Sequence, residues 1–490
     1  TTETHLFLSF FPANSKWKDC QTSFHDRRKR GVFNQMKLPD ELRQAYQKNA
    51  RQFSWVFPLE TEQTALAIFA AGEKAYQGER FFWQTPKKDF ALVGFGYETI
   101  LKGAETETHQ LNNFLKKEAA TRFQNMSISG TGALLFGGLP FDTEQTPTEA
   151  WGELGEGWFY LPSILFTFSG SRIYGTLNFS GSSEQEVEER WSTLVAQFDR
   201  LLATCEELPA VAETKIDKEE VAVTEWLQAV NETVAVLRED GPLKKVVLAR
   251  QLAVSSPEKI RSNQVLVNLM AQQQNTYLFA LEAKDTSFIG ATPERLLLGT
   301  KETFATACIA GTIKTGQTPE ETKTLGAQLL QDRKNTGEHQ IVVERLAKEL
   351  AKMTTSENSI QAPIILENRD VQHLYVPISG QRKPGISFLE SVMQLHPTPA
   401  LGGEPKELAV EWIRQYEPGS RGLYGAPIGW ISGNDDSGEF AVALRSGVFA
   451  GQQGVLYAGC GIVADSQAEL EREETKIKFQ PMLRGIGGQV

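Results

Sequence analysis

Cysteine is scarce in this sequence of 490 residues, and the four cysteines are far apart. Cys20, Cys205, Cys308 and Cys460 form no C-x-x-C pair, which disfavours a disulfide framework or a zinc site and favours reduced thiols. No run of roughly 18 apolar residues is present, and the apolar segment Leu6–Phe11 does not follow a basic region as a signal peptide would. We therefore expect a soluble, cytoplasmic protein without a membrane partner.

Positive charge and the common catalytic motifs are also lacking. The 50 lysines and arginines against 61 aspartates and glutamates give a net charge of −11, which argues against general nucleic-acid binding. The one basic run, Arg27–Arg30, is short and typical of a surface loop. The sequence has no G-x-x-x-x-G-K-[ST], G-x-G-x-x-G, H-E-x-x-H or G-x-S-x-G motif. The sequence therefore does not support an enzyme driven by nucleotides, a nicotinamide-dependent enzyme, a zincin or a common serine hydrolase. No nucleic-acid partner is expected either.

Hydrophobic periodicity divides the chain into an amino-terminal part, 1–206, a connection, 207–220, and a carboxy-terminal part, 221–490. The first part mixes short β-like runs and helical stretches, and the connection is rich in Glu, Ala, Pro and Lys. In the third part, helices alternate with antiparallel strands without a steady βαβ pattern. The predicted fold class is therefore α+β rather than a doubly wound sheet.

The periodicity predicts individual elements as follows. In the amino-terminal part the expected strands are Leu6–Phe11, Gly132–Phe136, Trp158–Phe168 and Arg172–Phe179, and the expected helices are Thr106–Phe123 and Glu184–Cys205. In the carboxy-terminal part the expected helices are Val221–Glu239, Thr324–Met353 with a break at Asn335–Gly337, and Ser466–Lys478. The expected strands there are Lys245–Val254, Thr276–Leu281, Ser287–Ala291, Arg295–Leu298, Thr303–Ile309 and the hairpin Glu439–Ala450 with Val455–Val463.

The last expected helix carries the first candidate site. Glu471, Glu474 and Lys478 are spaced i, i+3 and i+7, so all three side chains point to one side of a helix. Two carboxylates and an ammonium on one stripe can hold a divalent cation with an anionic ligand beside it. The alternative is a solvated helix face with an ordinary Glu–Lys pair.

Three further polar residues stand in apolar surroundings. Lys245 begins an apolar strand and is either an edge lysine with its head in solvent or a base with a lowered pKa in a cleft. Glu294 lies in a turn stiffened by proline and is either an ordinary turn acid paired with Arg295 or a carboxyl held in place for chemistry. Glu338 begins a helical segment, where the helix dipole alone favours an acid, or it joins Glu474 in binding Mg²⁺. Zinc is disfavoured because no His–Cys set accompanies these acids.

A guanidinium and a pair of glycines complete the candidate residues. Arg445 follows the apolar run Phe440–Leu444 and is expected inside a strand, where its side chain must be paired or must face a cleft and bind a carboxylate. Gly459 and Gly461 leave bare backbone that a ligand could approach closely, although core packing explains these glycines equally well.

Taken together, these segments resemble the chorismate-utilising enzymes, which include anthranilate synthase large subunit, aminodeoxychorismate synthase, isochorismate synthase and salicylate synthase. The resemblance covers about residues 220–488 and rests on nine motifs in family order. They are KVVLAR (245–250), GATPERLL (290–297), AGT (310–312), DRKNTGEH (332–339), HPTPALGG (396–403), RGLYGAPIGW (421–430), ALRSG (443–447), AGCGIV (458–463) and ETKIK (474–478). The resemblance implies two large antiparallel sheets packed as a sandwich with helices outside, and residues 1–206 as the variable part that wraps around the rest.

The resemblance also implies a magnesium site and a binding site for chorismate. Glu338 and Glu474 would ligate Mg²⁺, and Glu471 would support the metal through water. The residues that would bind substrate carboxylates, by side chain and by backbone respectively, are Arg445 and Lys478, and Gly459 and Gly461.

The remaining implied roles concern the ring and the proton transfers. Thr312 and His396 would line the ring, with Ala400 at a further substrate-binding position. Lys245 would activate the nucleophile, and Glu294 would protonate the departing C4 hydroxyl. These two residues would act from opposite faces of the ring.

Two positions indicate the subtype. Ala310 stands where aminodeoxychorismate synthases carry a lysine nucleophile, and Ala400 stands where anthranilate and salicylate synthases carry threonine. The HPTPA form resembles isochorismate synthases, and the long amino-terminal part resembles their menaquinone-pathway version. The implied reaction adds water at C2 and removes the C4 hydroxyl, without ATP or a glutamine amidotransferase subunit, in a monomer or homodimer.

Several alternatives remain open. The nearest are a salicylate synthase and a siderophore-pathway isochorismate synthase. An anthranilate synthase large subunit and a non-catalytic chorismate-binding regulator are further alternatives.

Overall fold

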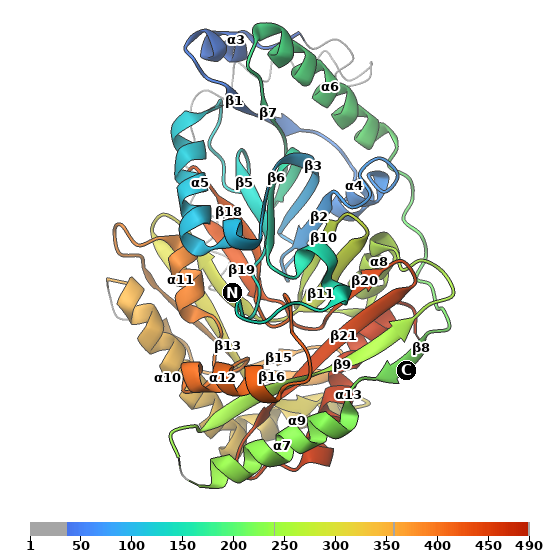
Figure 1. Ribbon diagram of the computed structural model, residues 1–490, viewed down its shortest axis with the longest axis vertical. Helices are drawn as coiled ribbons and strands as arrows, with labels where there is room; N and C mark the ends of the chain where they lie inside the picture. Colours follow the sequence, from blue (N-terminus) through green and yellow to red (C-terminus); the bar gives the residue numbers. More distant parts are fainter. Residues whose placement is uncertain (1–36, 240, 356–357, 489–490) are drawn as a thin grey trace.

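The computed structural model describes residues 37–239, 241–355 and 358–488 (Figure 1). The expected strand Leu6–Phe11 and the basic run Arg27–Arg30 lie outside these residues. Within them, helices alternate with a large set of strands, and β1 with β4 is the one parallel pairing among the described strands. The predicted α+β class is confirmed.

The strands form a continuous 21-stranded arrangement that forks at β6 (Trp158–Ser169). One branch runs through β3 (Phe90–Lys102), β2 (Arg80–Gln84), β10 (Tyr277–Ala283), β11 (Thr286–Thr292), β20 (Ser446–Ala450), β21 (Gln453–Ile462) and β9 (Lys245–Ser255), which also pairs with β8 (Asp217–Glu220) and β17 (Gly403–Glu404). The other runs through β5 (Leu134–Gly138), β18 (Pro427–Ser432), β19 (Gly438–Val442), β12 (Arg295–Gly299), β13 (Thr303–Lys314) and β16 (Val371–Gln381), which also pairs with β14 (Ser359–Ile360) and β15 (Ile364–Glu367). The strands β7 (Arg172–Ser180), β1 (Gln52–Leu59) and β4 (Arg122–Gln124) extend from β6 in turn.

The two branches pack face to face around an aromatic core. Phe81 of β2 stacks on Phe136 of β5, with ring centroids 4.1 Å apart and ring planes within 6°. Tyr277 of β10 donates a 2.7 Å hydrogen bond to Glu439 of β19. Because each pair joins one branch to the other, the predicted sandwich of two sheets is confirmed.

Helices cover the outer faces of both branches. The helices α4 (Ala65–Ala71), α8 (Ser262–Gln272) and α13 (Ala468–Gly485) pack on the first branch, and α3 (Asp40–Gln47) and α6 (Glu184–Ala203) share a core cluster with β1 and β7. The helices α5 (Thr108–Thr121), α10 (Arg333–Met353) and α11 (Phe388–Leu395) pack on the second, with α9 (Pro319–Gln331) preceding α10. The helices α7 (Val223–Arg238) and α12 (Lys406–Tyr416) enclose a smaller core against β9 and β21. Figure 1 shows most of these helices around the outside of the strands. None of the described helices is long and apolar enough to cross a membrane.

The amino-terminal and carboxy-terminal parts share one strand arrangement. Strand β2 pairs with β10, and β5 pairs with β18, so each branch begins with strands from before the predicted connection and continues with strands from after it. Residues 207–216 contain no helix or strand, but Asp217–Glu220 form β8. The predicted connection is therefore too long at its end, because the polar composition of β8 hid its pairing with β9. The division into parts itself stays a prediction.

Two other boundary predictions are wrong. The long helical segment is broken at Asp332, not at Asn335–Gly337, because the Asp332 side chain accepts a 2.7 Å hydrogen bond from Asn335 N and begins α10 there. The expected strand Glu439–Ala450 is two strands, β19 and β20. Arg445 lies between them with φ +47°, so it is not inside a strand as predicted.

Candidate active site

Helix α13 places one carboxylate and one ammonium against strand β21. The Lys478 Nζ lies 2.6 Å from Glu474 Oε1 and donates a 2.7 Å hydrogen bond to the carbonyl oxygen of Gly459. Desolvation acts to raise the pKa of Glu474, but the positive charges of Lys478, Arg445 and Lys245 outweigh it and the pKa is lowered. Glu474 is therefore held ionised among three cations.

The second carboxylate on this face of α13 has the opposite tendency. Burial and the nearby charge of Glu474 raise the pKa of Glu471, while contacts with Ser466, Cys460 and Lys478 act against them. Two carboxylates that repel each other can accept a cation between or beside them. Their oxygen donors suit a hard ion such as Mg²⁺ better than zinc.

The donor set of the candidate metal site is incomplete within the described side chains. No three His, Cys, Asp or Glu residues of that part of the chain gather as a metal-binding group. Glu338 lies near the beginning of α10, but its side chain is not among those that the structure describes. Its neighbour His339 donates from Nδ1 to Ala310 O at 3.1 Å, which packs this part of α10 against β13.

Lys245 is the first residue of β9, and its side chain extends over Gly461 of the neighbouring β21. A Cβ added at Gly461 would stand 2.7 Å from Lys245 Cε and 3.3 Å from Nζ. The positive charge of Lys245 contributes to the lowered pKa of Glu474 and opposes the rise in the pKa of Glu294. The ammonium therefore lies in the same electrostatic environment as both carboxylates, as a role in the site requires.

Glu294 lies in the turn between β11 and β12 and is 6% exposed. Its backbone is fixed because Val442 N donates to Glu294 O at 3.0 Å and Glu294 N donates to Thr292 Oγ1 at 3.3 Å. Burial raises the pKa of Glu294 to about 7, although Arg445, Thr398 and Lys245 oppose this rise. A carboxyl with a pKa near neutrality can both hold and release a proton at working pH. The alternative that Glu294 pairs with Arg295 is not what the structure has, since Arg295 pairs with Glu439 at 3.1 Å.

Arg445 faces the same carboxylates from the turn between β19 and β20. Desolvation lowers its pKa, and Tyr424, Glu474 and Glu294 act against that effect. Within the described residues its guanidinium makes no hydrogen bond or ion pair, and it lines a small cavity together with Lys478. A half-buried guanidinium without a direct partner is a binding group for an anion such as a carboxylate.

Thr312 connects to this group of residues through a histidine. It follows a bulge in β13 at Gly311, where φ is +76°, and its hydroxyl lies 3.0 Å from His373 Nδ1. Burial, together with the charges of Arg445 and Lys478, lowers the pKa of His373 to about 3. His373 is therefore a neutral, buried imidazole beside the two cations.

The segment after α11 contains His396 and Ala400, two of the residues that are predicted to bind the substrate. The His396 Nε2 donates to Phe141 O at 3.1 Å, and burial lowers the pKa of His396 to about 3. Ala400 is half-buried against the core of the second branch. Thr398, between them, is the residue of this segment whose side chain acts on Glu294. The ring-lining roles of His396 and Ala400 stay predictions.

The structure brings together most of the predicted site residues, and it adds three that sequence reasoning did not select. The connected residues are Lys245, Glu294, Arg445, Gly459, Gly461, Glu471, Glu474 and Lys478, with Thr312 joined through His373. The added residues are His373, Thr398 and the buried Tyr424, whose hydroxyl would stand 3.3 Å from a Cβ at Gly459. Thr398 and Tyr424 lie within the motifs HPTPALGG and RGLYGAPIGW, so the sequence could have indicated them. His373 lies within strand β16, and nothing in the local sequence marks it as a site residue.

The known proteins that this chain resembles are enzymes that bind chorismate. The family described as "Chorismate binding enzyme" matches residues 40–487. Isochorismate synthase MenF of Bacillus subtilis (strain 168) is 37% identical over 435 residues, which are 86% of this chain and 91% of the relative. The salicylate biosynthesis isochorismate synthase of Pseudomonas aeruginosa is 33% identical over 431 residues, which are 86% of this chain and 88% of that protein.

Solved structures agree in fold. The menaquinone-specific isochorismate synthase MenF of Escherichia coli superimposes with a TM-score of 0.75 at 25% identity, over 91% of this chain and 98% of that one. Anthranilate synthase component I of Streptococcus pneumoniae gives a TM-score of 0.66 at 21% identity, over 80% of this chain and 92% of that one, and supports the fold alone.

Proposed function

The chain belongs to the chorismate-binding enzyme family, and we propose that it is an isochorismate synthase, an isomerase that converts chorismate to isochorismate. The family match covers residues 40–487, which extends well beyond the range of about 220–488 over which the nine motifs indicated the resemblance. The observation that carries the proposal is the arrangement around Glu294. A buried carboxyl with a pKa of about 7 lies in the electrostatic range of one lysine and one arginine.

The proposed reaction uses that arrangement for two proton transfers. Lys245 takes a proton from water, which adds at C2 of the ring, and Glu294 gives a proton to the C4 hydroxyl, which leaves as water. Arg445 and Lys478 hold substrate carboxylates, helped by the bare backbone at Gly459. Water enters once and leaves once, so the product is an isomer of the substrate and no ATP is needed.

We propose Mg²⁺ as the cofactor, held by Glu474 and Glu338 and supported by Glu471 through water. The fit rests on the repulsion between the Glu471 and Glu474 carboxyls, which a cation would relieve. When bound, Mg²⁺ would neutralise a carboxylate of chorismate and hold it at the helix. Lys478 keeps Glu474 ionised and ready to bind.

Water as the nucleophile explains the expected partners. Since no ammonia is required, we propose that the enzyme acts without a glutamine amidotransferase subunit, as a monomer or homodimer. The free thiols of Cys205, Cys308 and Cys460 support a reducing, cytoplasmic setting. The similarity to MenF of Bacillus subtilis over most of the chain supports a role in menaquinone biosynthesis.

A second candidate is the supply of isochorismate for salicylate, which the Pseudomonas aeruginosa relative favours. Incubation of the protein with chorismate and Mg²⁺, followed by chromatographic separation of the products, tests the activity that both candidates share. The proposal expects isochorismate alone. Pyruvate and salicylate would indicate a salicylate synthase, an ammonia-dependent product would indicate anthranilate synthesis, and binding without turnover would indicate a regulator.

A further inference from the structure

Strand β9 begins with Lys245, and one of its edges is completed by side chains instead of a neighbouring strand. Its first edge pairs with β21 from Val246 to Ser255. Its second edge pairs with β17 at Lys245 and Val246, and with β8 from Leu252 to Ser255. Among the described strands, none pairs with the second edge between these two segments. The backbone groups that point to this edge must therefore find other partners.

Glu417 and Arg421 fill this gap with an ion pair. The guanidinium donates two hydrogen bonds to the carboxylate, of 2.7 Å from Nε to Oε1 and 2.6 Å from Nη2 to Oε2. The same Nη2 donates to Val247 O at 2.7 Å, and Ala249 N donates to Glu417 Oε2 at 2.7 Å. A neighbouring antiparallel strand would offer donors and acceptors to alternate residues in the same way. The two side chains therefore take the place of a strand at this edge.

Arg421 also joins strand β9 to the turn after α11. Its Nη1 donates to Leu401 O at 3.0 Å, and Val247 N donates to Gly402 O at 2.9 Å. The guanidinium lies over the ring of Phe141, 4.2 Å from its centroid. One side chain thus fixes the strand and the turn relative to each other.

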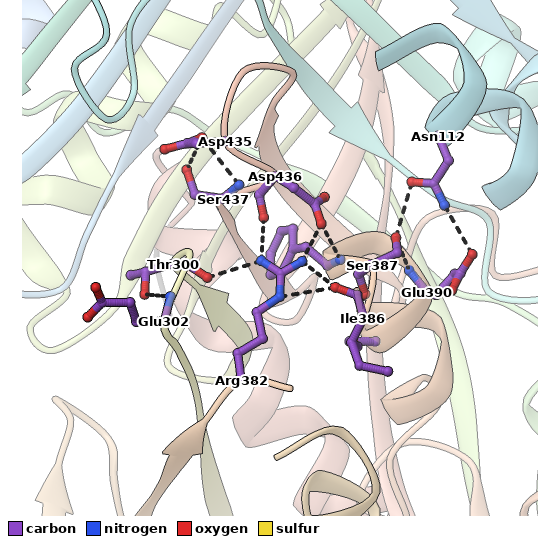
Figure 2. Close-up of polar contacts among 12 residues, drawn as sticks. Asn112, Thr300, Glu302, Arg382, Ile386, Ser387, Glu390, Asp435, Asp436 and Ser437 are labelled. Atoms are coloured by element: carbon purple, nitrogen blue, oxygen red, sulfur yellow. Dashed lines mark hydrogen bonds and ion pairs between the residues drawn. The ribbon is translucent and has the colours of Figure 1, made fainter. Parts of the chain in front are cut away.

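The opposite end of the segment that contains this turn is held by another arginine. Arg382 pairs with Asp436, whose Oδ2 accepts a 3.0 Å hydrogen bond from Phe388 N at the beginning of α11 (Figure 2). Helix α11 leads to the turn, and the turn leads to β17, which pairs with β9 at Lys245. The segment beside Lys245 is therefore anchored at both ends.

Burial shows why an ion pair at this place needs an explanation. The side chains of Arg421 and Glu417 are 1% and 3% exposed. A buried ion pair adds little net stability, because both charges lose their hydration when the protein folds. Apolar side chains of similar volume could fill the same space, but they could not donate to Val247 O or accept from Ala249 N. The geometry that the pair imposes on β9 therefore explains it better than stability does.

We propose that Arg421, paired with Glu417, is a positioning residue for Lys245. This inference rests on the proposed function, because it requires Lys245 to be the base. Val247 lies two residues after Lys245, so a shift of the strand at Arg421 moves the lysine backbone with it. The pair acts only through the position of Lys245 and makes no contact with the substrate in this account.

The test replaces Arg421 by lysine, which keeps the positive charge but cannot form the two-pronged contact with a carboxylate. Arg421→Lys should lower kcat roughly tenfold, because even a small displacement of a catalytic group slows the reaction. The KM for chorismate should change less than about twofold, since Arg445 and Lys478 hold the substrate. An unchanged kcat in a folded variant would overturn the inference.

A second buried ion pair provides a matched control. Arg122 and Glu118 have the same i,i+4 spacing, their side chains are each 2% exposed, and their Nε and Oε2 atoms lie 2.6 Å apart. Arg122 Nη1 also donates to a strand, at Phe53 O and 2.8 Å. Arg122→Lys should lower the melting temperature about as much as Arg421→Lys but leave kcat unchanged. Equal losses of kcat in both variants would overturn the inference, because general loosening of the fold would then explain them.

A double variant tests whether Arg421 acts through Lys245. Residues that act through one group show losses that do not add. Arg421→Lys combined with Lys245→Ala should therefore be no slower than Lys245→Ala alone, roughly 10²-fold below the wild type. A further tenfold loss in the double variant would overturn the inference.

A replacement pair of variants keeps the test available if Arg421→Lys does not fold. Glu417→Gln removes the ion pair while its amide oxygen can still accept from Ala249 N, and Glu118→Gln is its control. The same changes in kcat and KM are expected.

The outcomes are distinguishable from a failure of the proposed function. A wild-type protein that leaves chorismate unchanged overturns the proposed function. A wild-type protein that makes isochorismate, with a wild-type kcat in Arg421→Lys, overturns this inference alone.

Discussion

The Lys245 side chain crosses strand β21 directly over Gly461, where a Cβ would stand 2.7 Å from Lys245 Cε. Real Cβ atoms do not approach carbon this closely, so any other residue at position 461 must push the lysine away. Absence of a side chain at Gly461 is therefore what lets the ammonium lie near Glu294 and Glu474.

Gly461→Ala should lower kcat by roughly 10²-fold, since displacement of a catalytic group by about 1 Å has an effect of this size. The melting temperature should change little, because the contact is with the end of a flexible side chain. Gly241→Ala is the matched control, as a Cβ there meets no atom within 4 Å. Equal rates for the two variants would contradict the proposed position of Lys245.

Removal of the base itself gives a second test. Lys245→Ala should reduce isochorismate formation by roughly 10²-fold or more, the usual effect of losing a positioned general base. Initial rates from chorismate and from isochorismate should fall together, because the same group serves both directions. A wild-type rate in this variant would remove Lys245 from the mechanism.

Glu294→Gln should abolish turnover and stabilise the folded protein at mildly alkaline pH. The folded-state pKa of Glu294 is about 7 against 4.5 for a free glutamate, so the folded protein holds a proton that the unfolded chain releases. Its contribution to stability is present below the unfolded pKa and is lost as pH rises through about 7. The glutamine variant escapes this loss, which amounts to about 3 kcal/mol.

Urea unfolding of both proteins across this pH range measures the difference. The gap between glutamine variant and wild type should widen as pH rises from about 5 to about 8, the interval that spans both pKa values. A constant gap would show that Glu294 has an ordinary pKa and is unsuited to be the acid.

If Mg²⁺ binds at Glu474, substitution of this residue should weaken metal binding, whereas substitution of an acidic residue on the exposed side of α13 should not. Glu474→Gln should weaken Mg²⁺ binding by at least tenfold in calorimetry, since removal of a metal ligand loses one charged donor. Glu473→Gln is the control, because the Glu473 carboxylate pairs with Lys476 at 2.6 Å on the exposed side of the helix. Glu338→Gln should behave like Glu474→Gln. Unchanged Mg²⁺ binding in both Glu474→Gln and Glu338→Gln would contradict the assignment of the metal site.

Much of the fold could be predicted because periodicity reports burial directly. The strand beginning at Lys245 lies where its pattern placed it, to within one residue. The helix that carries Glu474 begins within two residues of its predicted start but continues to Gly485 rather than ending at Lys478. The break at Arg445 could not be predicted, since the preceding run of apolar residues is typical of a continuous strand. At this break the chain passes from β19, which pairs with β12, to β20, which pairs with β11.

The site was partly predictable for a related reason. Lys245 and Arg445 stand out because charge interrupts an apolar pattern. Thr398 and His373 do not, because a threonine in a turn and a histidine in a strand are locally unremarkable, and their importance comes from contacts with residues about 60 to 100 positions away. Such contacts depend on the sheet topology, which periodicity alone does not encode.

The central claim, that Lys245 and Glu294 add water at C2 and remove the C4 hydroxyl, is tested most directly by isotope labelling. The enzyme is incubated with chorismate and Mg²⁺ in H₂¹⁸O, and the isochorismate is analysed by mass spectrometry with fragmentation. The account predicts one ¹⁸O atom in each isochorismate, located in its C2 hydroxyl. Isochorismate without ¹⁸O, which would mean that the hydroxyl moves within the substrate, or no isochorismate at all would contradict it.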